Sequence, residues 1–174
     1  MGAARGGSAR SDQGAADHPV RNPDPRGPRQ SMIVVDASVA VQVVLDEPGS
    51  AIAMAALRAR TWSAPDLIFP ECANIIWKRH RLGEIDAHQA DEAVQLIEAL
   101  NMYTEPSRRL IRRASGLSRA LDHSAYACFY LAHAEDLQAL MLTADSKLIN
   151  KVRQSKAVNV EMLSLPEFAK EIGL

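Results

Sequence analysis

The stretch MIVVDASVAVQVVLDE, residues 32–47, begins in the pattern of a β-strand and continues in that of a helix. Residues 32–35 are apolar and mostly β-branched, which favours a buried strand. Asp36 ends this run, and the apolar segment 38–45 is typical of a helix. Because aspartate is a favoured N-cap, the stretch predicts a strand, a turn at Asp36 and a helix.

The same order recurs near the end of the chain. The strand-like residues 139–143 are followed by Asp145 and a helical segment over 146–152. In parallel sheets, ligands bind beyond the carboxyl ends of the strands. We therefore expect Asp36 and Asp145 to share one edge of a sheet.

The rest of the chain alternates in the same way. Further predicted strands are 62–64, 102–105 and 158–163, and further predicted helices are 50–60, 70–81, 86–100, 107–115, 122–135 and 166–172. This order predicts an α/β domain with a central, mostly parallel sheet flanked by helices. Hydrophobic residues make up 47% and charged residues 24%, which is ordinary for a globular domain.

Residues 1–31 have a different composition from the rest. They contain five glycines, four prolines and no aromatic residue, and Val20 is their only large aliphatic residue after Met1. Such a segment buries too little apolar surface to offset its ordering entropy. We predict a disordered tail or a start codon assigned too early, with a single folded domain over residues 32–174.

Two more acidic residues precede helical patterns. Glu71 follows Phe69-Pro70, and Asp122 precedes His123-Ser124. Capping or the helix dipole is enough to explain any one of these acids. Four acids at strand ends and helix starts, however, suit a hard divalent ion such as Mg²⁺ or Mn²⁺, which takes oxygen ligands.

Four segments resemble, in order, the motifs of the PIN-domain family. They are MIVVDASVAVQVVLDE, FPECANIIW, LDHSAYACFYLA and LTADSKL, and they carry Asp36, Glu71, Asp122 and Asp145. Their separations resemble those of small VapC-type toxins of VapBC toxin–antitoxin pairs. The third motif of the family often reads Tyr-Asp-Ala, and we match its acid to Asp122.

The resemblance implies a three-layer α/β/α fold and a metal-dependent endoribonuclease. It implies RNA as substrate, a VapB-like antitoxin as inhibitor, a homodimer and a cytoplasmic location. Asp36, Asp122 and Asp145 are the expected metal ligands, and all four acids are expected to be catalytic. Glu71 either binds metal, directly or through water, or orients the nucleophile, and both one and two ions are compatible with the pattern. Ser38, Asn74 and Thr143 are expected supporting residues.

Attraction to RNA has to come from local positive charge, because the formal net charge is −1. Basic clusters lie beside three of the motifs, and their alternative role is that of solvated helix faces: Lys78, Arg79, Arg81; Arg108, Arg109, Arg112, Arg113; Lys147, Lys151, Arg153. His123 is interpreted as a surface or capping residue. Cys72 and Cys128 lack zinc-ligand spacing and are expected to be buried reduced thiols. No apolar run is long enough to span a membrane.

Other functions remain as alternatives. A haloacid-dehalogenase-type phosphatase using Asp36 as nucleophile needs a second aspartate two residues later, where this chain has Ser38. A receiver domain needs an acidic pair near the first strand, which is missing. The main alternative is a catalytically inactive PIN-like module that binds RNA or protein, against which the retention of all four acids argues.

Overall fold

The predicted alternation of strands and helices is confirmed by a computed structural model, which describes residues 32–174. The predicted tail, residues 1–31, lies outside the described residues. The strands are β1 (Met32–Val35), β2 (Thr61–Pro65), β3 (Met102–Glu105), β4 (Leu140–Leu142) and β5 (Met162–Leu163). The helices are α1 (Ala37–Val44), α2 (Ser50–Ala59), α3 (Ile68–Arg81), α4 (Ala87–Ala99), α5 (Ser107–Leu121), α6 (Ala125–Leu137), α7 (Ser146–Gln154) and α8 (Leu165–Glu171).

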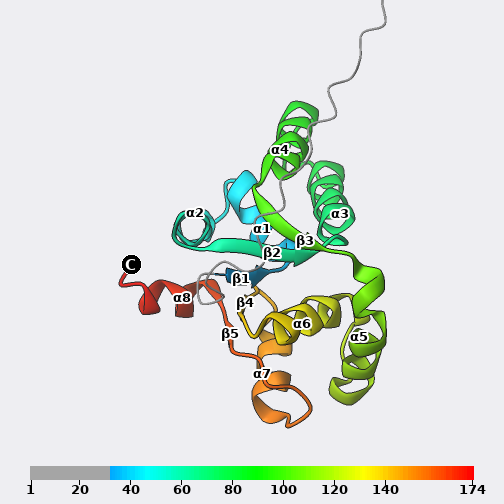
Figure 1. Cartoon of the computed structure of the whole chain (residues 1–174). Coiled ribbons are helices and arrows are strands. Elements are labelled where there is room, and N and C mark those ends of the chain that lie inside the picture. Colours follow the sequence, from blue (N-terminus) through cyan, green and yellow to red (C-terminus); the bar gives the residue numbers. More distant parts are fainter. Residues whose placement is uncertain (1–31) are drawn as a thin grey trace, which may run out of the picture.

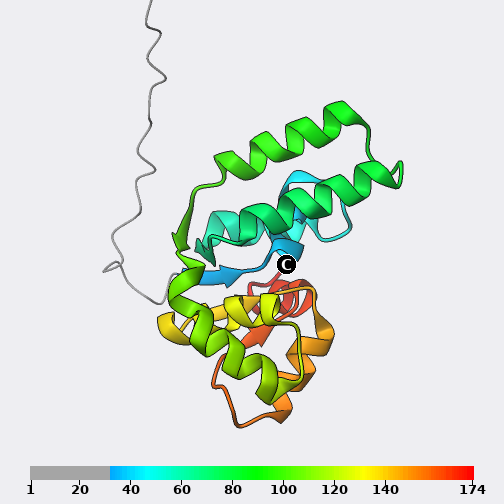
Figure 2. The same cartoon turned by 90° about the vertical axis from the view of Figure 1, so that its right-hand side faces the viewer.

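The sheet has the strand order β3-β2-β1-β4-β5, and all neighbouring strands are parallel. The chain runs outward from β1 through β2 to β3, then returns across to β4 and continues to β5. Because parallel crossovers are almost always right-handed, this reversal puts the connecting helices on opposite faces. Helices α1–α4 cover one face and α5–α7 the other, which gives the predicted three-layer fold (Figures 1 and 2).

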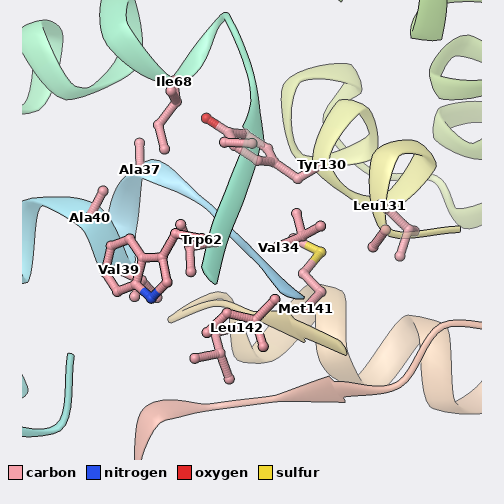
Figure 3. Close-up of a cluster of buried hydrophobic side chains, with 14 of the residues drawn as sticks. Val34, Ala37, Val39, Ala40, Trp62, Ile68, Tyr130, Leu131, Met141 and Leu142 are labelled. Atoms are coloured by element: carbon pink, nitrogen blue, oxygen red, sulfur yellow. The ribbon is translucent and has the colours of Figure 1, made fainter. Parts of the chain in front are cut away.

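The core lies on both sides of the central strands. Val34, Met141 and Leu142 of β1 and β4 are fully buried and belong to one cluster (Figure 3). Ala40 of α1 and Leu131 of α6 join this cluster from the two helical layers. Burial of a side chain as large as leucine stabilises the fold by about 2 kcal/mol. The apolar strand patterns therefore hold the ends of β1 and β4 in place.

The boundary between α5 and α6 differs from the prediction. The helix predicted over 107–115 continues to Leu121, and the one predicted over 122–135 begins only at Ala125. Asp122 is the C-cap of α5 and has a left-handed backbone, with φ 46° and ψ 53°. Aspartate tolerates this conformation better than most residues. The prediction that Asp122 opens a helix is therefore wrong, because the residue ends one.

A buried polar pair joins α6 to the sheet. His133 Nε2 lies 2.7 Å from Ser63 Oγ of β2, and the His133 ring stacks on Tyr103 of β3, with ring centroids 6.4 Å apart. Both members of the pair are buried. Burial disfavours the charged imidazole and lowers the pKa of His133 to about 4. His133 thus remains neutral in the folded protein near neutral pH.

Both cysteines are buried free thiols, as expected. Burial raises the pKa of Cys72 to about 12 and that of Cys128 to about 11. Both thiols therefore remain protonated near neutral pH. Among residues 32–174, no helix combines the length and apolar character needed to cross a membrane.

His133 is predicted to make the fold less stable in acid. The unfolded chain binds a proton at His133 near pH 6.5, whereas the folded protein binds it only near pH 4. Stability from this group is therefore complete above pH 6.5 and falls as the pH drops to 4, by roughly 3 kcal/mol in total. Urea unfolding between pH 4 and 7.5 should show a flatter pH dependence for His133→Gln than for the wild type.

The exposed His88 provides the matched control for this experiment. His88→Gln should keep the wild-type pH profile. The folded-state pKa values of Asp36 and Glu71 are raised, so these two acids make the protein less stable as the pH rises. This contribution is the same in the wild type and both variants, and it cancels when their pH profiles are compared. Parallel profiles for wild type and His133→Gln would show that His133 does not contribute this pH dependence.

Candidate active site

The ends of β1 and β4 bring two of the predicted acids to one edge of the sheet. Val35 pairs with Leu142 in the parallel register of these strands. Asp36 follows β1 directly, and Asp145 caps the helix that follows β4. The connections from β1 and β4 lead toward opposite edges of the sheet. Such a reversal opens a crevice at the carboxyl ends, as in other open α/β sheets.

Asp36 is held through both oxygens of its carboxylate. Ser38 Oγ donates to Oδ1 at 2.5 Å, and the Val39 N–H donates to the same oxygen at 3.2 Å, which makes Asp36 the N-cap of α1. Thr143 Oγ1, which is fully buried, donates to Oδ2. Ser38 and Thr143, which were expected to be supporting residues, thus donate to Asp36, and Asp36 also caps α1.

The two hydroxyls also connect Asp36 to the backbone after β4. Ser38 Oγ accepts the Ala144 N–H at 3.0 Å, and Thr143 Oγ1 accepts the Asp145 N–H, also at 3.0 Å. Each hydroxyl therefore donates to the carboxylate and accepts from the loop between β4 and α7. This network fixes the position of Asp145 relative to Asp36.

Within residues 32–174, no basic side chain forms an ion pair with Asp36. Burial is the largest influence on this carboxyl group and raises its pKa, while the hydrogen bonds from Ser38, Thr143 and Val39 lower it. No positively charged group is among the causes of the shift. A cation near Asp36 would supply the missing compensation.

Glu71 faces Asp36 from the other side of the crevice, in the first turn of α3. The hydroxyl of Tyr130 on α6 donates to Glu71 Oε2. Figure 3 shows the Tyr130 ring reaching from α6 toward Ile68 at the start of α3. Burial raises the pKa of Glu71, the Tyr130 hydrogen bond lowers it, and repulsion from Asp36 raises it further. The two acids are thus close enough to repel each other.

Asp145 is also held through both oxygens. The Leu148 N–H donates to Oδ1 at 2.9 Å, which is the N-cap bond of α7. His123 Nε2 lies 2.9 Å from Oδ2. Sequence reasoning interpreted His123 as a surface or capping residue and missed this contact, because the two residues are 22 positions apart.

One pocket collects most of the predicted site residues. Asp36, Glu71 and Asp145 line it together with Ser38 and Asn74. The other lining residues are Ala37, Ile75, Ser124, Tyr126, Ala127 and Tyr130, and the pocket has a volume of about 300 Å³. Thr143 lies beneath it, bonded to Asp36. Tyr130, which sequence reasoning also missed, is four positions after Tyr126, and this helical spacing is the signal that points to it.

Asp122 is not among the residues that line this pocket. Its side chain is exposed, and its backbone carbonyl accepts a hydrogen bond from Lys151 Nζ of α7. The residue serves the turn between α5 and α6, where its left-handed conformation is needed. The structure therefore brings three of the four predicted acids together and leaves Asp122 outside.

The pocket offers the oxygen donors that a hard divalent cation prefers, from three carboxylates and the Asn74 amide. Within residues 32–174, no three His, Cys, Asp or Glu side chains converge closely enough to form a cage around one ion. Mg²⁺ usually keeps several waters and binds through one or two carboxylates plus substrate phosphate. The donor set therefore fits a partly hydrated ion and not a closed structural site.

Many of the predicted basic residues have protein partners. Arg79 pairs with Glu47 and Glu84, and Arg81 lies over the Trp77 ring at 4.9 Å. The further ion pairs are Arg109–Glu105, Arg113–Glu135 and Arg153–Glu167. In the part of the chain that the structure describes, the exposed residues Lys78, Arg108, Arg112 and Lys147 form none of these pairs. They remain available to contact phosphates.

Comparisons with known proteins identify the family. The fold resembles the crystal structure of PAE2754 from Pyrobaculum aerophilum, with a TM-score of 0.56 and 18% identity over 83% of this chain and 98% of that one. It also resembles VapBC2 from Rickettsia felis bound to a DNA fragment from their promoter, with a TM-score of 0.54 and 8% identity over 76% of this chain and 98% of that one. A search of curated proteins gave no match. Residues 33–154 match the family model of the PIN domain, and the chain therefore belongs to the PIN-domain family.

Proposed function

We propose that this protein is a metal-dependent endoribonuclease and the toxin of a type II toxin–antitoxin pair. The observation that carries the proposal is the pocket that Asp36, Glu71 and Asp145 line at the carboxyl edge of the sheet. PIN domains are generally nucleases, which supports hydrolysis of a phosphodiester bond. The VapC-like order of the motifs favours RNA as the substrate.

A phosphodiester resists attack by hydroxide because both are anions. A divalent cation bound by the acids of the pocket would reduce this repulsion. Asp36 and Asp145 would hold Mg²⁺ or Mn²⁺ on the floor of the pocket. When bound, the ion neutralises the phosphate, lowers the pKa of a water and stabilises the leaving oxygen. Asp122 is not included among the proposed ligands, since its side chain is exposed outside the pocket.

The other residues of the pocket orient the reacting groups. Ser38 and Thr143 keep Asp36 in one rotamer, with both oxygens at fixed positions. Tyr130 holds Glu71 Oε2, and we assign Glu71 Oε1 to orienting the attacking water. Asn74, which is exposed on α3, is placed to donate to a phosphate or ribose oxygen. Lys78 and Lys147 would bind flanking phosphates.

The partners proposed for this chain follow from the same resemblance. A VapB-like antitoxin would inhibit the nuclease in the cytoplasm, and the toxin would act as a homodimer. The structural similarity to VapBC2, a protein whose structure includes promoter DNA, is compatible with such a pair.

An inactive module that binds RNA or protein is the second candidate. Its support is that no three possible ligands converge on one point within residues 32–174. Ala127 of α6 lines the pocket directly after Tyr126, whereas the family motif often reads Tyr-Asp-Ala. The acid that we matched to Asp122 is thus missing from the pocket wall, and cleavage assays separate the two candidates.

The first prediction concerns cleavage itself. Purified protein should cleave single-stranded RNA or RNA loops with Mg²⁺ or Mn²⁺ and stop with EDTA. Asp36→Asn and Asp145→Asn should each lower the rate at least about a hundredfold, because losing several kcal/mol of charge stabilisation has that effect. Asparagine retains the caps of α1 and α7, so both variants should fold.

Asp122→Asn is the matched control, because it removes an acid outside the pocket and keeps a residue that tolerates the left-handed turn. Its cleavage rate should equal that of the wild type. If the wild type cleaves no RNA with either metal, or if Asp36→Asn and Asp145→Asn cleave as well as it does, the nuclease proposal is wrong.

A second prediction concerns metal binding without RNA. Mn²⁺ at a hundredfold excess over Kd should stabilise the wild type by about 2.7 kcal/mol. For a domain of this size, that corresponds to a rise in Tm of about 5 to 10 °C. Asp36→Asn should lose most of this rise, while Asp122→Asn should keep it. Equal melting curves with EDTA and with Mn²⁺ for the wild type would contradict the metal site.

A third prediction uses the open position on α6. Ala127→Asp would add a carboxylate to the pocket, which three carboxylates already line. Repulsion should lower the Tm of the metal-free protein, and Mn²⁺ should raise it by more than in the wild type, since one more ligand is available. Melting curves with EDTA and Mn²⁺ test both changes. A lower Tm with an unchanged metal effect would indicate that this position does not face the ion.

A further inference from the structure

The turn between α5 and α6 forms hydrogen bonds with the helices on both sides of it. On one side, Ser118 of α5 forms two hydrogen bonds with the backbone of His123. The Ser118 hydroxyl donates to the His123 carbonyl at 2.7 Å, and the Ser118 carbonyl accepts the His123 N–H at 3.1 Å. On the other side, Lys151 of α7 donates to the Asp122 carbonyl. The backbone of His123 is therefore held against the helix that Asp145 caps.

The side chain of His123 points back to Asp145. It is only 13% exposed, whereas that of Asp145 is 35% exposed and lines the pocket. Nε2 lies 2.9 Å from Asp145 Oδ2. An ionised carboxylate only accepts hydrogen bonds, so Nε2 is the donor, and imidazole provides this N–H in its Nε2-protonated neutral form and in its charged form.

Both oxygens of the Asp145 carboxylate thus accept a hydrogen bond. The Leu148 N–H holds Oδ1 from within α7, and His123 holds Oδ2 from the neighbouring turn. Two bonds from different segments leave the carboxylate a single rotamer. The Thr143 hydroxyl links the Asp145 backbone to the Asp36 carboxylate. The free lone pairs of the Asp145 oxygens are therefore fixed relative to Asp36.

We propose that His123 is a positioning residue that orients Asp145 for binding a divalent cation, through the hydrogen bond from Nε2 to Oδ2. The proposal rests on the metal-dependent function proposed above. Hydrogen bonds to a ligating carboxylate typically contribute 10- to 100-fold in metal affinity, because the ligand does not have to be ordered on binding. His123 itself is not among the residues that line the pocket, so it acts through Asp145.

The test measures Mn²⁺ binding to the full chain without RNA, by the loss of the paramagnetic resonance signal of free Mn²⁺. His123→Leu removes the donor, and His123→Asn keeps a polar side chain that is too short to reach Oδ2. Both should raise the Kd for Mn²⁺ at least about tenfold. His123→Gln, whose amide nitrogen reaches nearly as far as Nε2, should stay within about threefold of the wild type. His88→Leu is the control for loss of an exposed histidine.

Double variants separate positioning from direct coordination. Asp145→Asn should weaken Mn²⁺ binding, and adding His123→Leu to it should cause no further loss, since the hydrogen bond serves only that carboxylate. Combined with Glu71→Gln, His123→Leu should keep its full effect. Residues that act through one another give such non-additive cycles, whereas independent ligands give additive ones.

The outcomes are distinct. If Asp145→Asn weakens binding but His123→Leu and His123→Asn bind Mn²⁺ as the wild type does, the role of His123 is refuted and the metal site stands. Additive losses with Asp145→Asn would likewise refute positioning. If the wild type binds no Mn²⁺, the proposed function and this inference fail together. Circular dichroism and Tm show whether each variant is folded. If His123→Leu does not fold, the comparison between His123→Asn and the wild type decides the test.

Discussion

The site depends on a buried carboxylate that joins two strands. Asp36 ends β1, and the hydroxyls of Ser38 and Thr143 connect its two oxygens to the backbone that follows β4. The carboxylate satisfies all these donors only when both strands end at the same level of the sheet. A buried carboxylate without such donors would cost several kcal/mol. The register of the central strands and the geometry of the pocket are therefore set by the same bonds.

The same network explains why the pocket is electrostatically incomplete. Hydroxyls and N–H groups orient Asp36 but bring no net charge, and burial still raises its pKa. Glu71 adds a second negative charge nearby, bonded to the neutral hydroxyl of Tyr130. In the described residues, by contrast, arginines compensate acids away from the pocket, such as Glu135 and Glu167. The fold thus leaves Asp36 and Glu71, which form none of these ion pairs, together at the position where a cation and a phosphate would meet.

Much of this arrangement was predictable from the sequence, since a strand followed by an acid and a helix defines a position at a sheet edge. Asp36 and Asp145 were found by that rule. Asp122 was expected to open a helix because aspartate is a favoured N-cap, but aspartate also tolerates the left-handed conformation that ends α5, and three residues separate α5 from α6. The bond from Tyr130 to Glu71 spans 59 positions and depends on how two helices dock. Local patterns contain no information on such a contact.

That contact also shows that the pocket belongs to the whole domain. Glu71 comes from α3, in the layer of α1–α4, and Tyr130 from α6 on the opposite face of the sheet (Figures 1 and 2). Their hydrogen bond passes the carboxyl ends of the strands and connects the two helical layers. Each layer alone would leave one partner without the other. The acids therefore reach their final positions only when both layers have packed on the sheet, so that the geometry of the pocket depends on complete folding of the domain.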